Sequence, residues 1–226
     1  MKFEEFLLES EIDSLKKELE SSDSYLKAPN GKKSNLPEKQ WLLVRTKSFK
    51  NWFGDWENDP STASKVVDKN GEPLICYHNS TVSGIEIFNP FRKANSTGGY
   101  TDKLSDDEAN TLDNIRQRFA DGKRPPFRYD TGIWLTASKD AYKGYGSHQY
   151  ALFVNIRNPR RGQHVSWKDA VADNKDTVWD GVIVGDFDEV VVGDFDEVVV
   201  GIPEQIKSIN NSNFKKSSPN INESKL

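Results

Sequence analysis

Residues 73–78 read Pro-Leu-Ile-Cys-Tyr-His, a short apolar run that ends at a histidine and is followed by Asn79-Ser80. Runs of this length, rich in β-branched and aromatic residues and bounded by turn residues, are typical of strands. Further candidate strands of this kind are 84–88, 132–136, 150–156, 181–184 and 197–202. Helical patterns interrupt them over 105–120, where Ser105 is followed three residues later by Glu108, and over 138–145. Many short strands with few helices predict an α+β domain built around two packed sheets.

These candidate elements fall within residues 39–209, which we take as one folded domain. In the preceding region, 1–20, apolar side chains recur at intervals of three to five from Phe3 to Leu19, which predicts an amphipathic helix. Its polar face is mostly acidic, which favours packing on this chain or a partner over a membrane surface. Residues 21–38 have the composition of a polar linker, and 210–226 that of a disordered polar tail.

The composition argues against several functional classes. The 226 residues include 31 basic and 35 acidic side chains, and the net charge of -4 gives no signal for nucleic acid or an anionic membrane. A single cysteine, Cys76, rules out an internal disulfide and fits a reducing compartment. No stretch approaches the about 18 apolar residues of a membrane span, and the acidic N-terminus lacks the apolar core of a signal peptide. We therefore expect a soluble, non-secreted protein.

Familiar catalytic signatures are also missing from the sequence. No cysteine pair and no histidine pair at helical spacing is present, so the sequence predicts no metal site. A phosphate loop of the GxxxxGK type and a nucleophile elbow are absent as well. Zinc-enzyme and hydrolase interpretations are correspondingly weak.

Three clusters nevertheless carry residues suited to chemistry. The first is His78 at the end of its apolar run, the second is the segment 131–146, and the third is Asp196-Glu197 at the start of a valine-rich strand. Taken singly, each has an ordinary structural explanation: a structural histidine, a core strand with a glycine-containing loop, and a solvated turn. Their combination and order are what favour a functional site.

The third cluster is complicated by a tandem duplication. Residues 184–191, Val-Gly-Asp-Phe-Asp-Glu-Val-Val, are repeated without change at 192–199. Eight residues are too few for a structural repeat, and the pattern predicts a strand end, a turn and a second strand. The duplication supplies two equivalent glutamates, Glu189 and Glu197, which the local sequence does not distinguish.

The order of the clusters resembles the His-Tyr-Glu class of ADP-ribosyltransferases, the group of diphtheria toxin and the poly(ADP-ribose) polymerases. Tyr77-His78-Asn79-Ser80 is similar to the family's Tyr-His-Gly-Thr, with Asn79 where Gly is common. The segment from Gly132 to Tyr145 resembles the part that packs on nicotinamide, where two aromatic rings lie eleven residues apart, as Trp134 and Tyr145 do. Trp134 stands where the family usually has Tyr. Glu197-Val198-Val199-Val200, followed by Gln205, is similar to the strand that carries the catalytic glutamate.

A branch found in polyvalent proteins of phages and mobile elements is more similar still. The resemblance spans roughly residues 46–209, and the order of its segments is what makes it specific. The segments that carry it are 48–56, 64–68, 70–74, 155–159, 180–183 and 203–208.

The resemblance implies a split β-sandwich of two small mixed sheets with peripheral helices, and NAD⁺ as co-substrate without a metal. Glu197 would stabilise the positive charge that develops on the ribose, with Glu189 as the second candidate. His78 would bind the ribose on the adenosine side. The main chain around Asn79 would meet the nicotinamide amide, and Ser80 would add a contact to the ribose or to the amide. The nicotinamide ring would pack on the segment of Gly132, Trp134 and Tyr145. The arginine-modifying relatives carry an acidic residue two before the glutamate, and Phe195 at that position gives no support for arginine as acceptor.

The main functional hypothesis is a mono-ADP-ribosyltransferase that modifies a protein of a bacterial host or competitor. It would act in the host cytoplasm or travel with the virion. Two alternatives stay open: an NAD⁺ glycohydrolase using the same site, and an inactive interaction or virion module docked through the 3–20 helix. The acceptor and the oligomeric state are not readable from the sequence.

Overall fold

The computed structural model describes residues 3–91, 104–123, 127, 131–141, 143–162, 167–172, 178–185, 197–211 and 213–223. Seven strands form one mixed sheet in the order β4-β5-β6-β2-β1-β3-β7. The strands are β1 (Cys76–Ser80), β2 (Ile133–Thr136), β3 (His148–Val154), β4 (Pro159–Gly162), β5 (Gly181–Val184), β6 (Glu197–Val200) and β7 (Ile206–Ser208). β4 and β5 are parallel and every other neighbouring pair is antiparallel.

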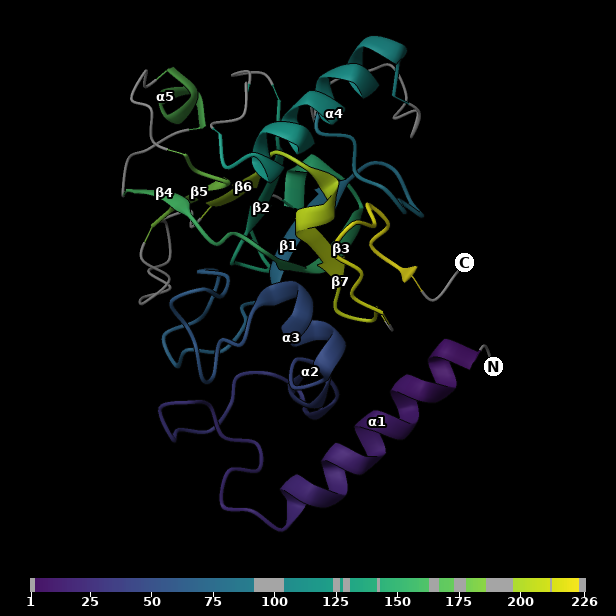
Figure 1. Ribbon diagram of the computed structural model, residues 1–226, viewed down its shortest axis with the longest axis vertical. Helices are drawn as coiled ribbons and strands as arrows, with labels where there is room; N and C mark the ends of the chain where they lie inside the picture. Colours follow the sequence, from purple (N-terminus) through teal and green to yellow (C-terminus); the bar gives the residue numbers. More distant parts are fainter. Residues whose placement is uncertain are drawn as a thin grey trace.

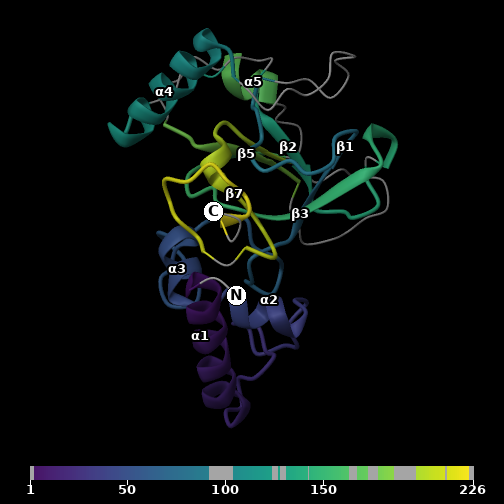
Figure 2. The same ribbon diagram turned by 90° about the vertical axis from the view of Figure 1, so that its right-hand side faces the viewer.

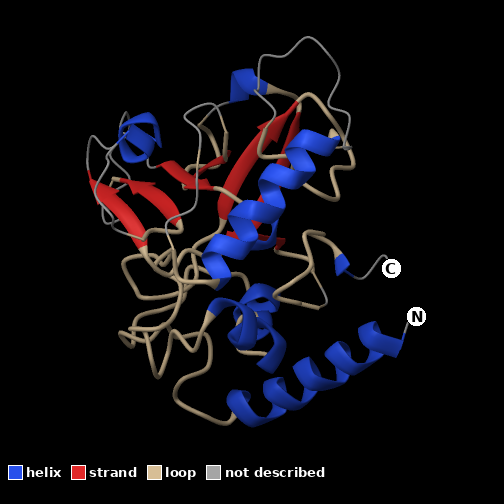
Figure 3. Cartoon of the chain, turned by 45° about the horizontal axis from the view of Figure 1, so that its top comes forward, coloured by secondary structure: helices blue, strands red, loops and turns tan. Residues whose placement is uncertain are grey.

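The sheet has a narrow seam between β1 and β2. These two strands share one register pair, Tyr77 with Thr136, whereas β1 and β3 share five pairs and β2 and β6 share four. We call β1, β3 and β7 the His78 half, and β2, β4, β5 and β6 the Glu197 half. In Figure 3 the strands, drawn in red, do not all run in the same direction.

The two halves fold toward each other across this seam. The register aligns Glu197, Thr136 and Tyr77 in one row across β6, β2 and β1. Gly201 lies four residues from this row toward one end of the strands, and Asn155 lies four residues from it toward the other end. In a flat sheet these eight residues would span roughly 27 Å along the strands. The Gln205 side chain nevertheless bonds both the Gly201 amide and the Asn155 carbonyl, so the sheet is strongly bent.

The prediction of two separate small sheets therefore differs from the structure, which has one hydrogen-bonded sheet with a seam. The bend has the same physical result as the expected packing of two sheets, because it buries one face of each half against the other. A single apolar core contains Cys76, Leu152 and Ile206 from the His78 half together with Leu135 and Val198 from the Glu197 half. Short-range patterns predicted β1, β2, β3, β5 and β6 but carry no information on the one register pair that joins the two halves.

Helices cover the sheet on two sides (Figure 1). On one side, α4 (Asp106–Ala120) and α5 (Trp167–Ala172) pack with Phe127 and Trp179 over β5, β6 and β2. The expected capping box of α4 is present, because Ser105 Oγ accepts from the Glu108 amide and the Glu108 carboxylate accepts from the Ser105 amide. This reciprocal bonding satisfies two of the amides that a helix start leaves without intrahelical partners.

On the other side, an aromatic cluster joins the N-terminal region to the sheet. It is built on α2 (Glu38–Leu43) and α3 (Lys47–Phe53), and its members include Trp41, Phe49 and Trp52 together with Phe153 of β3. α1 (Phe3–Glu20) lies farthest from the sheet in Figure 2, with Ile12, Leu15 and Leu19 partly buried against this cluster. No helix among the described residues is long and apolar enough to span a membrane.

Several local predictions differ from the structure. Residues 84–88 form no strand, 143–145 form only a 3-10 turn (η1, Lys143–Tyr145), and β4 and β7 were not predicted.

The region expected to be a disordered tail instead contributes Phe214 and Ile221 to the core in its described part. Lys207 holds this segment, because its buried ammonium bonds the carbonyls of Ser218 and Asn220 and the Glu223 carboxylate. Burial and polar pairing of a few side chains thus order a segment whose average composition is that of a coil.

Two of these differences have simple physical causes. β4 and β7 are three to four residues long, and their sequences, Pro-Arg-Arg-Gly and Ile-Lys-Ser, have no apolar alternation. Each pairs with one neighbouring strand, β4 with β5 and β7 with β3. The predicted linker 21–38 also packs on the domain, with Ala28 and Leu36 buried.

Candidate functional site

His78 occupies the seam of the sheet. Its Nδ1 lies 2.8 Å from the carbonyl oxygen of Trp134 on β2, and because a carbonyl only accepts, Nδ1 carries the proton. Phe88 and Tyr150 lie around the ring, with centroids 4.8 and 6.5 Å away. Burial lowers the pKa of His78, and the bond to the Trp134 carbonyl only partly opposes that shift. The imidazole is therefore neutral near pH 7.

The other ring nitrogen of His78 is left without a partner. Nε2 is buried and makes no hydrogen bond in the structure. With the proton fixed on Nδ1, Nε2 presents a lone pair that can only accept a hydrogen bond. A buried acceptor without a donor is uncommon in folded proteins, and here it lies where the two halves of the sheet part.

Trp134 and Gly132 lie on β2 and immediately before it. Trp134 is half-buried and packs against the cluster under α4 and α5. Gly132 has a φ of +125°, and a Cβ there would lie 2.9 Å from Val199 Cγ1 and 3.4 Å from the Trp134 ring. The glycine is required because a side chain would be strained in this conformation and would push against the indole.

Asn79 and Ser80 follow His78 on β1. The Asn79 side chain faces the protein: Nδ2 donates to the Ala141 carbonyl at 3.0 Å, and Oδ1 accepts from Gln149 Nε2 at 3.2 Å. Its backbone is ordinary strand, since Leu26 is the one non-glycine residue with positive φ in the described part of the chain. Ser80 is buried, and its hydroxyl oxygen accepts from the Val82 amide at 3.1 Å. Replacement of the family's Gly by Asn79 therefore causes no backbone strain.

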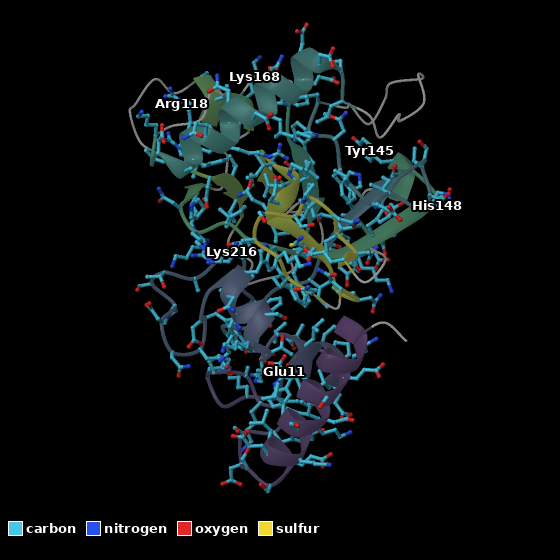
Figure 4. All side chains as sticks on the ribbon, turned by 45° about the vertical axis from the view of Figure 1, so that its right-hand side comes forward. Glu11, Arg118, Tyr145, His148, Lys168 and Lys216 are labelled. Atoms are coloured by element: carbon cyan, nitrogen blue, oxygen red, sulfur yellow. The ribbon has the colours of Figure 1, made fainter. Side chains whose placement is uncertain are left out.

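Tyr145 ends η1, on the loop that leads from β2 to β3. Its side chain is 47% exposed, and Figure 4 shows it near His148, on the upper part of the molecule away from Glu11 of α1. The next residue, Gly146, touches β1 so closely that a Cβ there would lie 2.0 Å from the Ser80 carbonyl carbon. This contact places η1 against the end of β1, two residues beyond His78.

Glu197 is the first residue of β6 and lies in the same register row as the seam. It is opposite Thr136 of β2, which is opposite Tyr77 of β1. Two cross-strand steps of about 5 Å put the Cα of Glu197 roughly 10 Å from that of Tyr77, the neighbour of His78. The other glutamate of the duplication, Glu189, lies outside the described residues.

The structure thus brings the His78 ring against the Trp134 carbonyl, and places Asn79, Ser80 and Tyr145 at the end of β1. Glu197 lies in the register row of Tyr77, the neighbour of His78, two strands away. Sequence reasoning missed Gln149, because the strand was expected to begin at residue 150. Within the described residues, no group of three or more His, Cys, Asp or Glu side chains is arranged to hold a metal ion.

Comparison with known proteins adds one finding. Residues 68–216 match the model of a family described as ADP-ribosyltransferase in polyvalent proteins. The matched range holds all seven strands and the residues described above. No curated protein and no solved structure matches the chain. Since the match covers about two thirds of the 226 residues, the chain belongs to the ADP-ribosyltransferase family of polyvalent proteins.

Proposed function

We propose that this chain is a mono-ADP-ribosyltransferase that cleaves NAD⁺ and transfers ADP-ribose to a protein acceptor. The observation that carries the proposal is the buried, unpartnered Nε2 of His78 at the seam. We place the acceptor among proteins of a bacterial host or competing element, in the host cytoplasm, because the family occurs in polyvalent proteins.

The His78 acceptor fits the donor groups of NAD⁺. A neutral imidazole nitrogen needs a donor, which the ribose hydroxyls, the carboxamide and the adenine amino group can supply, whereas the phosphate oxygens only accept. The family resemblance favours the ribose. A hydroxyl that binds Nε2 would satisfy the buried atom and hold the dinucleotide by its adenosine-side ribose. Burial keeps the imidazole neutral, so this acceptor is available at physiological pH.

The nicotinamide end would lie between Trp134 and Tyr145. Aromatic rings stack on a planar heteroaromatic ring and exclude water from its bond to ribose. Trp134 supplies an indole held against the cluster under α4, and Tyr145 supplies a ring with free surface at the end of β1. The main chain at Asn79 and the Ser80 region would meet the carboxamide.

Glu197 would act on the reacting ribose. When the bond between C1′ and the nicotinamide nitrogen breaks, its electron pair leaves with nicotinamide, which becomes neutral, and positive charge develops on the ribose. A carboxylate beside the ring stabilises that charge and accepts a hydrogen bond from the 2′-hydroxyl. The acceptor's nucleophile then bonds C1′ and releases its proton.

The duplication provides a matched control for the test. Glu189→Gln and Glu197→Gln make the same change in the same eight-residue sequence. Incubated with NAD⁺ and a bacterial lysate, Glu197→Gln should release nicotinamide about 10²–10³ times more slowly than wild type, while Glu189→Gln keeps the wild-type rate. Label from NAD⁺ should appear on protein only with wild type and Glu189→Gln.

Other outcomes would change the proposal. Nicotinamide release without labelled protein would replace the transferase with an NAD⁺ glycohydrolase. Loss of activity in Glu189→Gln alone would move the catalytic role to the first copy. Equal rates in all three proteins would remove both glutamates from the mechanism.

A further inference from the structure

We propose that Asn79 and Gln149 form a clamp that positions Tyr145 for binding the nicotinamide end of NAD⁺. The two residues are a register pair of β1 and β3, so their side chains leave the sheet on the same face. This inference rests on the proposed function and assigns Asn79 and Gln149 a positioning role in it.

The clamp uses each hydrogen of the Gln149 amide. Nε2 donates to Asn79 Oδ1 at 3.2 Å and to the Lys139 carbonyl at 2.7 Å. The Asn79 amide then donates to the Ala141 carbonyl at 3.0 Å. Two carbonyls of the loop that follows β2 are thereby held by side chains of β1 and β3. Glutamine amides carry two donors, so both bonds form together.

The loop held in this way leads directly into η1 and Tyr145. It is bonded near its start through Lys139 and Ala141, and it touches β1 again at Gly146. Tyr145 lies between these fixed points and is 47% exposed. The clamp therefore constrains the backbone from which the Tyr145 side chain extends.

In the clamp, Asn79 makes side-chain hydrogen bonds that the family's glycine cannot make. Glycine at this position would keep the strand and its main-chain groups, but would remove both side-chain bonds to the loop and to Gln149. The asparagine thus adds a constraint on the loop without changing the β1 backbone.

The test compares Gln149→Glu and Asn79→Gly with wild type. Glutamate has nearly the shape of glutamine but lacks the two donor hydrogens, so it loses the bonds to Asn79 and Lys139. Gln117→Glu is the control, because Gln117 is an exposed glutamine on α4 whose side chain bonds Asp121. We expect the two clamp variants to raise the KM for NAD⁺ about tenfold and to leave kcat within about twofold, since Glu197 and His78 are untouched. Gln117→Glu should match wild type.

A double variant shows whether the effect passes through Tyr145. Tyr145→Ala should raise KM at least as much as Gln149→Glu, and the combination should be no worse than Tyr145→Ala alone. Hydrogen exchange of the 139–141 amides without NAD⁺ should be at least about tenfold faster in both clamp variants. Melting temperatures should stay within a few degrees of wild type.

Each contrary result has a distinct meaning. If wild type cleaves NAD⁺ and the clamp variants keep its KM and its exchange rates, the clamp is wrong and the proposed function stands. Fully additive effects of Gln149→Glu and Tyr145→Ala would also overturn it, as would an equal loss of kcat and stability. If wild-type protein neither binds nor cleaves NAD⁺, the proposed function fails, and the clamp's role in NAD⁺ binding fails with it.

Discussion

The two halves of the sheet are tied at two places by polar side chains that differ in one respect. Gln205, after β6, uses its entire hydrogen-bonding capacity: Oε1 accepts from the Gly201 and Ile202 amides, and Nε2 donates to the Asn155 and Asp180 carbonyls. His78, at the seam, uses Nδ1 and leaves Nε2 unpartnered. Gln205 is buried, and so is the unpartnered Nε2 atom of His78.

This comparison separates a structural tie from a binding group. A buried polar side chain whose bonds are all made adds stability and fixes geometry, whereas one with a missing partner destabilises the free protein. The Gln205 region holds the bent sheet together, whereas the proposed function assigns the unpartnered Nε2 of His78 to a ribose hydroxyl of NAD⁺.

The largest effect should follow from breaking the Gln205 tie. Gln205→Leu keeps the volume but leaves two amides and two carbonyls without their side-chain partner. We expect the free energy of unfolding to fall by about 3 kcal/mol, because each buried group left unpaired costs about 1–3 kcal/mol and some regain water. Urea denaturation measures this loss. The control Gln117→Leu removes one exposed bond on α4 and should change stability by less than about 0.5 kcal/mol.

A loss from Gln205→Leu no larger than that of Gln117→Leu would contradict the tie. It would show that the apolar core alone holds the two halves in their bent arrangement.

Replacing His78 should change the KM for NAD⁺ while changing the free energy of unfolding very little. His78→Phe removes the bond to the Trp134 carbonyl, which destabilises, and also removes the unpartnered Nε2, which stabilises. These opposing terms should leave the free energy of unfolding within about 1 kcal/mol of wild type. The KM for NAD⁺ should nevertheless rise about tenfold or more, because the ribose hydroxyl loses its acceptor. Urea denaturation and steady-state nicotinamide release measure the two quantities.

A large loss of stability with an unchanged KM would reverse the interpretation. His78 would then resemble Gln205, as a tie between β1 and β2 and not as a binding group.

The sequence supplied the candidate residues of the site, but not the geometry of the sheet that positions them. His78, Trp134 and Glu197 stand in or next to strands that short apolar runs reveal, and a family resemblance supplied their proposed roles. The seam was not predictable, because it depends on one register pair, Tyr77 with Thr136, between segments more than fifty residues apart. Gln205 was noted as part of a motif, but its bonds to Asn155 and Asp180 exist only once the sheet has bent.

The same limit explains the errors at the C-terminal end. Residues 210–226 have the composition of a flexible tail, and averaging over composition hides Phe214 and Ile221, two large apolar side chains that the core buries. Lys207 and Glu223 look like surface residues in sequence, yet both are buried and paired with each other. Pairing of this kind is a property of the folded chain, since either charge alone would be excluded from the interior.

The smallest predicted effect is a pH dependence of stability that belongs to His78. Burial lowers its folded-state pKa below the usual 6.5 of the unfolded chain, so between these two values the unfolded state binds more protons. Titration of His78 therefore leaves the free energy of unfolding unchanged above pH 6.5 and lowers it as the pH falls below that value. We expect wild type to lose stability between pH 6.5 and 5.5 relative to His78→Phe, because only wild type gains that proton on unfolding. Thermal or urea denaturation of both proteins across this range measures the difference, and the carboxylates and the other two histidines cancel because the proteins share them. Parallel curves for the two proteins would mean that His78 titrates alike in the folded and unfolded states, which would contradict the buried, neutral acceptor on which the binding role depends.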